Sequence, residues 1–112
     1  MQPETLKYLY DIEQACQAIF GFIKGKALLD YDCDNLLRSA IERQLTIAGE
    51  ALNLAVKTEP EIATRISNVR EIINLRNVIV HGYTTVENET IWGILQSDLL
   101  QLSREVESIF HK

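Results

Sequence analysis

Apolar side chains recur every three or four residues along most of this 112-residue chain, and this spacing limits the folds that it can adopt. Leu9, Ile12, Cys16, Ile19 and Ile23 form one such stripe, which predicts a helix with one buried face. No stretch alternates apolar and polar residues, so no sheet is expected. The pattern predicts a single all-α domain over residues 1–112, an antiparallel bundle of four main helices and one short helix. The expected helices cover residues 4–24, 35–56, 58–66 (the short one), 68–81 and 88–110.

Residues that favour helix ends lie at several of these boundaries. Gly25 and Gly82 follow the first and fourth helices, where glycine can adopt the left-handed conformation that ends a helix. Thr58 and Asn68 each precede a glutamate by three residues, which is the spacing of a capping box. These four residues support the predicted breaks between helices.

Acidic residues alternate at Asp30, Asp32 and Asp34, as they do in calcium-binding loops. An EF-hand loop beginning at Asp30 would need glycine where Asn35 stands and glutamate where Ile41 stands. We therefore expect the three carboxylates to cap the helix that follows and to favour its positive end.

The helix expected over residues 35–56 has an apolar stripe wider than one core contact requires. Its members are Leu37, Ile41, Leu45, Ile47, Ala48, Ala51, Leu52 and Ala55. This width predicts two contacts, one with the chain's own core and one with a partner. The small residues around Gly49 would permit another helix to approach closely. Arg43 and Glu50 lie seven positions apart on one face, either as a polar pair near a site or as an exposed pair of little energetic weight.

Composition places the chain among ordinary globular proteins, with 46% hydrophobic and 24% charged residues. It contains no run of about 18 apolar residues and no basic leader followed by an apolar segment, so we expect a cytoplasmic protein. Cys16 and Cys33 lie far apart in the sequence and have no histidine nearby. We expect both to be reduced and structural, without a disulfide or a metal.

The net charge of −5 has the wrong sign for a general nucleic-acid binder. Its distribution is uneven: residues 1–36 and 84–112 each carry −3, whereas residues 37–83 carry +1. Any RNA contact would therefore be local, with Arg65, Arg70 and Arg76 as candidates. For Arg65 and Arg70 a solvated surface position is the simpler interpretation.

The segment 75–83 places four polar side chains in an apolar run that ends near a glycine: Arg76, Asn77, His81 and Tyr83. On a helix, Asn77 and His81 share a face and Arg76 nearly coincides with Tyr83, while Arg76 and His81 project roughly 140° apart. Histidine exchanges protons near neutral pH, and arginine offers a planar fork of donors for phosphate oxygens. This set could cleave RNA without a metal, with His81 as general acid or base, Arg76 on the phosphate and Asn77 orienting the imidazole. The alternative is that His81 only compensates the helix dipole at its C-terminus.

The Arg76-Asn77-x-x-x-His81-Gly82-Tyr83 segment resembles the R-x-x-x-x-H-x-Y signature of HEPN-domain proteins, in the HepT-like branch. The resemblance extends along nearly the whole chain, through Ala40–Arg43, Ile47–Ala51, Ile72-Ile73, Ile91-Trp92 and Asp98-Leu99. Asn68 and Val69 stand where many relatives carry Pro-Trp, and Asn74 stands where glycine is common. These departures bear on packing more than on the polar motif.

The resemblance implies a homodimer in which two R-x-x-x-x-H motifs line a shared cleft. It also implies the toxin of a two-gene toxin–antitoxin system, a metal-independent endoribonuclease acting on RNA, in some cases tRNA. The implied partner is an MNT-type nucleotidyltransferase antitoxin, which would neutralise the toxin by transferring AMP to Tyr83. The alternative role for Tyr83 is packing at the helix end.

A second hypothesis is a non-catalytic helical dimer that binds a nucleotidyltransferase or a nucleotide. A pure scaffold has no need for Arg76 and His81 together, so the motif favours cleavage. A metal enzyme or a bound cofactor is not expected, because His81 and His111 are the only imidazoles.

Overall fold

The computed structural model describes residues 1–82 and 86–110. Within these ranges the chain is all-helical and contains no strand, as the sequence predicted. Its elements are α1 (Pro3–Ile23), α2 (Leu28–Cys33), α3 (Asn35–Thr58), the 3-10 helix η1 (Pro60–Thr64), α4 (Val69–His81), α5 (Asn88–Gln96) and α6 (Asp98–Phe110).

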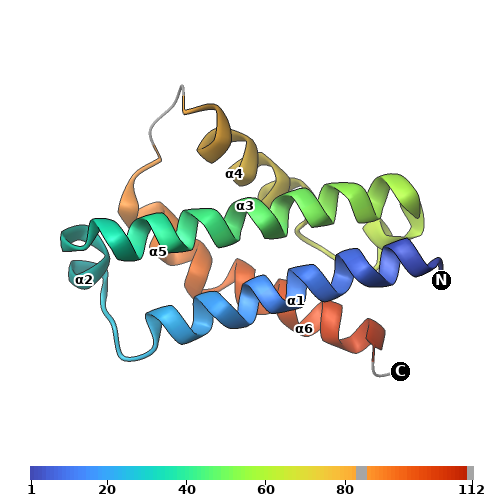
Figure 1. The fold of residues 1–112 in the computed structure, drawn as a ribbon, viewed down its shortest axis with the longest axis horizontal. Helices are drawn as coiled ribbons and strands as arrows, with labels where there is room; N and C mark the ends of the chain where they lie inside the picture. The colour runs from blue at the N-terminus through green and yellow to red at the C-terminus, as the bar shows by residue number, and fades with distance from the viewer. Residues whose placement is uncertain (83–85, 111–112) are drawn as a thin grey trace.

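The longest helices, α1 and α3, run antiparallel beside each other and form the most extensive contact in the fold (Figure 1). α4 packs against α3, α6 packs against α1, and α5 contacts both α2 and α6. Tyr8 and Ile47 remain half-buried along the α1–α3 contact, and fully buried residues from all the helices form one core. α3 therefore lies between α1 and α4.

The position of α3 explains the breadth of its apolar stripe. Six of the eight apolar residues noted in the sequence are buried, whereas Leu37 and Ile47 are half-buried. Contacts with α1 and α4 of the same chain account for most of this surface. Contacts within the chain thus explain much of the stripe, and a contact with a partner stays a prediction.

The acidic segment before α3 forms a short helix that the sequence analysis did not predict. Asp30 accepts a hydrogen bond from the N–H of Ala27 (2.7 Å) and so caps α2, while Asp34 accepts one from the N–H of Leu37 (3.0 Å) and caps α3. Asp32 instead accepts from the side-chain amide of Asn88 (3.0 Å). Only Asp34 therefore caps the following helix, and the prediction for the other two was wrong.

Tyr31 is the reason why this short helix docks on the fold. Its side chain is fully buried, and its ring centroid lies 5.6 Å from that of Trp92 on α5. Burial, followed by the nearby Glu42 carboxylate, raises the pKa of Tyr31 to about 12. The buried aromatic ring anchors a segment that the sequence pattern indicated only as a cap.

The helix expected over residues 88–110 breaks into α5 and α6 at Ser97. The Ser97 hydroxyl donates to the Gly93 carbonyl (2.9 Å), and serine side chains that bond the backbone in this way weaken a helix locally. Next to the break, the side-chain amide of Asn68 donates to the Asp98 carbonyl (2.8 Å). Asn68 occupies the N-cap position of α4 but makes no side-chain cap there, so its predicted capping bond was wrong.

The expected capping box at Thr58 is also absent, because α3 continues to Thr58 and η1 begins after Glu59. The Glu59 carboxylate accepts hydrogen bonds from the N–H of Gln2 (3.0 Å) and the hydroxyl of Thr5 (3.2 Å). Both bonds lower the pKa of Glu59, and the bond from Gln2 has the larger effect. Glu59 therefore ties the start of α1 to the end of α3.

Two further features concern the glycines and cysteines. Gly25 and Gly82 both have positive φ, at 75° and 66°, as their places after α1 and α4 predicted. Both cysteines are free: Cys16 is buried, and burial raises the pKa of its thiol to about 12, whereas Cys33 is exposed. Cys16 thus fits the structural role expected of it, and Cys33 does not.

No helix in the described ranges is long and apolar enough to cross a bilayer.

Candidate functional site

Arg76 of α4 lies against Gly49 of α3. A Cβ atom placed on Gly49 of α3 would lie 2.3 Å from Cβ and 2.8 Å from Cγ of Arg76, closer than real Cβ atoms come to other carbon atoms. Only glycine therefore fits at position 49 with this helix spacing. The expectation that small residues on α3 permit a close helix approach is confirmed at Gly49.

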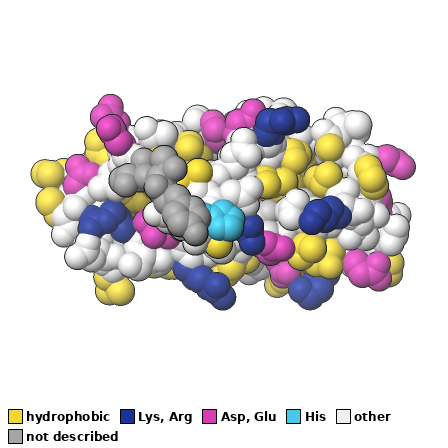
Figure 2. Space-filling model, turned by 90° about the horizontal axis from the view of Figure 1, so that it is seen from above, with side chains coloured by type: hydrophobic (Ala, Val, Ile, Leu, Met, Phe, Trp, Pro, Cys, Tyr) yellow, Lys and Arg dark blue, Asp and Glu magenta, His cyan; other side chains and the backbone are white. Residues whose placement is uncertain are grey.

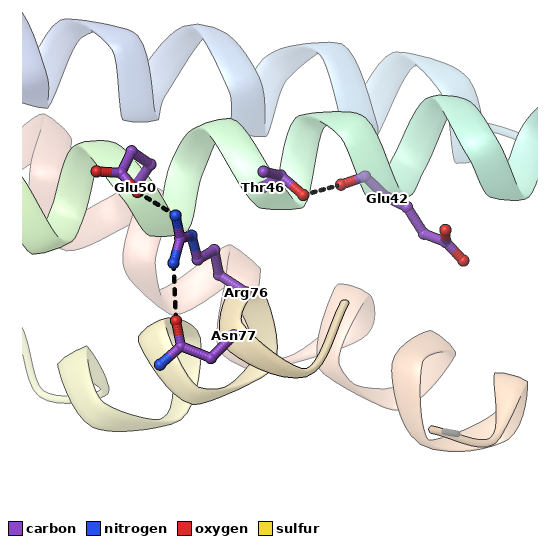
Figure 3. Close-up of polar contacts among 5 residues, drawn as sticks. All are labelled: Glu42, Thr46, Glu50, Arg76 and Asn77. Atoms are coloured by element: carbon purple, nitrogen blue, oxygen red, sulfur yellow. Dashed lines mark hydrogen bonds and ion pairs between the residues drawn. The ribbon is translucent and has the colours of Figure 1, made fainter. Parts of the chain in front are cut away.

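The guanidinium of Arg76 is held by two neighbours. Its Nη2 forms an ion pair with Oε2 of Glu50, and its Nη1 donates to Oδ1 of Asn77 (2.9 Å) (Figure 3). The Arg76 side chain is 24% exposed and the Glu50 side chain 41%, so the pair is accessible from one side. Nε of Arg76 is buried and has no hydrogen-bond partner among residues 1–82 and 86–110. We call Gly49, Glu50, Arg76 and Asn77 the Arg76 site.

The polar pair that we considered between Arg43 and Glu50 does not form, because Glu50 binds Arg76 instead. Arg43 is exposed and has no ion pair with any residue in the described ranges. Sequence spacing placed Arg43 and Glu50 on one face correctly. It could not reveal that α4 brings a second arginine to the same face.

A pocket of about 340 Å³ opens beside the Arg76 site, between α1 and α3. Its charged lining residues are Lys7, Asp11, Arg43, Glu50 and Arg76. Lys7 forms an ion pair with Asp11 (2.9 Å), and Arg76 forms its own ion pair with Glu50. Arg43 therefore supplies the unpaired charge of what we call the α1–α3 pocket.

A second pocket, of about 230 Å³, lies near the C-terminal end of α4 and is lined in part by Arg38, Glu42 and Gly82. Arg38 donates from Nη1 to the backbone carbonyls of Tyr31 (2.7 Å) and Asp32 (2.5 Å). Its guanidinium is thus engaged by the backbone, and the pocket offers less to an anion than the α1–α3 pocket does.

His81 is the last residue of α4 and is exposed. Gly82 then ends the helix in the left-handed conformation, and its N–H donates to the Val78 carbonyl (3.0 Å). Asn77 makes its hydrogen bond to Arg76, and its role in orienting His81 stays a prediction. Tyr83 lies outside the described residues.

Among the described residues, the surface around α4 carries no single basic patch. Lys and Arg side chains alternate there with acidic and apolar ones (Figure 2). The described residues contain no cluster of three or more His, Cys, Asp or Glu that could hold a metal ion.

Comparison with known proteins relates this arrangement to a family. The family model described as “Ribonuclease HepT-like” matches residues 12–109. A protein of Caldanaerobacter subterraneus subsp. tengcongensis named “Putative RNase TTE0752” is 30% identical over 105 residues, which cover 94% of this chain and 93% of that protein. “Probable ribonuclease HepT” of Thermococcus cleftensis is 29% identical over 106 residues, with 91% and 92% covered. No solved structure matches the chain.

The all-helical fold and the placement of Arg76 and His81 on one helix are typical of a HEPN domain, as the sequence resemblance implied. The chain belongs to the HepT-like ribonuclease family.

Proposed function

We propose that this protein is a metal-independent endoribonuclease and the toxin of a toxin–antitoxin system. The observation that carries the proposal is the fixed guanidinium of Arg76, held by Glu50 and Asn77 on the helix that ends in His81. A guanidinium already in position can stabilise charge on a phosphate as its bonds rearrange. His81 supplies the proton transfer that the reaction needs.

The proposed reaction is attack by a ribose 2′-oxygen on the adjacent phosphorus. The 2′-hydroxyl loses its proton to a base, the bond from phosphorus to the 5′-oxygen breaks, and that oxygen takes a proton from an acid. One imidazole cannot serve as base and acid in the same step. A homodimer that brings two copies of His81 to one cleft would supply both groups.

The first test is cleavage of a broad RNA pool in EDTA by protein purified without an antitoxin. We expect cleavage to persist, and the products to carry 2′,3′-cyclic phosphate and 5′-hydroxyl ends. Loss of activity in EDTA and recovery with Mg²⁺ would contradict the metal-independent mechanism. Absence of cleavage under both conditions would favour the alternative, a non-catalytic helical dimer that binds a nucleotidyltransferase or a nucleotide.

We further propose that an MNT-type nucleotidyltransferase is the antitoxin and transfers AMP to Tyr83. Tyr83 lies two residues beyond His81, so an adenylate there would add bulk and negative charge where the RNA phosphate must approach. In this transfer the Tyr83 oxygen bonds to the α-phosphorus of ATP and pyrophosphate leaves. Incubation with the nucleotidyltransferase, ATP and Mg²⁺ should therefore add the mass of an adenylyl group to the tryptic peptide that contains Tyr83, and end RNA cleavage.

The matched control for this second test is Tyr83→Phe, which keeps the ring and removes the acceptor oxygen. This variant should cleave RNA like the wild type and remain active after incubation with the nucleotidyltransferase. Modification at another residue, or neutralisation of Tyr83→Phe, would show that Tyr83 is not the acceptor.

A further inference from the structure

The α1–α3 pocket combines an unpaired cation with an aromatic wall, and neither belongs to the polar motif on α4. Its volume of about 340 Å³ lies within the range of small-ligand sites, roughly 300–1,000 Å³. Its two carboxylates, Asp11 and Glu50, are each paired with a cation. The charge left over is that of Arg43, so the pocket is locally positive on an acidic protein.

Tyr8 forms the aromatic wall. Tyr8 is half-buried, packs against the hydrophobic core and also lines the pocket, so the core holds its ring in place. Lys7 Nζ lies 6.0 Å from the centre of this ring. Ile47 and Leu54 of α3 supply further apolar surface. An aromatic ring beside basic side chains is the combination by which proteins bind single-stranded nucleic acid, with the base on the ring and the phosphate on the cation.

We infer that the α1–α3 pocket binds one nucleotide of the RNA substrate, next to the phosphate that Arg76 contacts. The base lies against Tyr8 and a flanking phosphate binds Arg43. The inference deepens the proposed function and rests on it, because Arg76 lines the pocket and thereby joins it to the reaction centre. It also explains how a chain with a net charge of −5 holds RNA, through one local site instead of a basic surface.

The test is the affinity for a fluorescent single-stranded 12-mer of random sequence, 2′-O-methylated throughout so that it cannot be cut. Anisotropy titrations in EDTA at several salt concentrations would compare wild type, Arg43→Ala and Tyr8→Leu. Arg43→Ala should weaken binding about tenfold, because it removes a charged hydrogen bond. It should also reduce the slope of log K against log salt by about 0.7, the value for one phosphate contact on a single strand. Tyr8→Leu should weaken binding roughly tenfold through lost stacking.

Two matched variants serve as controls. Arg104→Ala removes the same charge from an exposed position on α6 that does not line the pocket, and Tyr8→Phe keeps the stacking surface. Both should bind within about twofold of wild type, because neither removes the proposed contact. Circular dichroism and light scattering would verify fold and oligomeric state for every variant.

The outcomes separate this inference from the proposed function. Selective weakening in Arg43→Ala and Tyr8→Leu supports the pocket even if the wild type cuts no RNA. Unchanged affinity in both variants, or no RNA binding by the wild type, overturns the pocket proposal, even if cleavage of unmodified RNA proceeds. If Arg43→Ala turns a dimer into a monomer, the pocket is a contact between copies and the inference is wrong.

Discussion

Replacing His81 with alanine is expected to lower the rate of RNA cleavage by about 10²–10⁴-fold, the usual contribution of a general acid or base. The variant keeps Arg76 with Glu50 and Asn77, so phosphate binding should persist while proton transfer is lost. Single-turnover cleavage in EDTA with enzyme in excess would isolate the chemical step from product release. The affinity for uncleavable RNA should change much less than the rate.

The fold should tolerate this substitution, since His81 is exposed at the last position of α4. Substitutions at exposed positions usually change stability by about 0.5 kcal/mol or less, too little to unfold the domain. Asn74→Ala, at another exposed position of α4, is a suitable control and should cleave normally. Cleavage by a folded His81→Ala variant within about threefold of wild type would exclude His81 as the general acid or base of the reaction.

Gly49→Ala is expected to impair both stability and cleavage, although the added methyl group touches no substrate. The new Cβ would lie 2.3 Å from Cβ of Arg76, an atom fixed to the backbone of α4, so α3 and α4 must separate. Overpacking of this kind costs roughly 1–3 kcal/mol, and the better helix propensity of alanine offsets about 0.5–1 kcal/mol of that. Denaturant titration should therefore show the free energy of unfolding lowered by about 1–2 kcal/mol.

The effect on cleavage should exceed the effect on folding. A shift of α4 carries Arg76 away from Glu50, and a displacement of about 1 Å at a reacting group can cost on the order of 10²-fold in rate. Gly93→Ala is the matched control, because Gly93 lies in α5 and a Cβ there would meet nothing within 4 Å. That variant should keep full activity and gain about 0.5–1 kcal/mol of stability. Full activity in Gly49→Ala at wild-type stability would contradict the close contact described here.

The helical class and the main helix boundaries followed from the sequence because amphipathic spacing and glycine C-caps are local signals. The α2 helix did not, because it depends on the burial of Tyr31 against Trp92, which lies far along the chain. The break at Ser97 was missed because the apolar stripe of 88–110 continues through it, although the hydroxyl of Ser97 bonds the backbone one turn earlier.

The placement of the candidate residues was predicted in part, and their roles stay predictions. Arg76, Asn77 and His81 are close in sequence, so their grouping on one helix needed no tertiary information. The partner of Arg76 could not be predicted without tertiary information. The sequence analysis considered Glu50 as a partner of Arg43, because spacing compares only residues on the same helix. Gly49 was noted as a small residue, and its neighbour Arg76 became evident only when α4 was placed against α3.

The ion pair between Arg76 and Glu50 has an entropic consequence for RNA binding. A free arginine side chain has roughly 2 kcal/mol of rotamer entropy to lose when it is immobilised. In this protein Glu50 and Asn77 already restrict Arg76, so much of that ordering occurs when the chain folds and not when RNA arrives. An RNA phosphate would therefore meet a side chain that is already ordered.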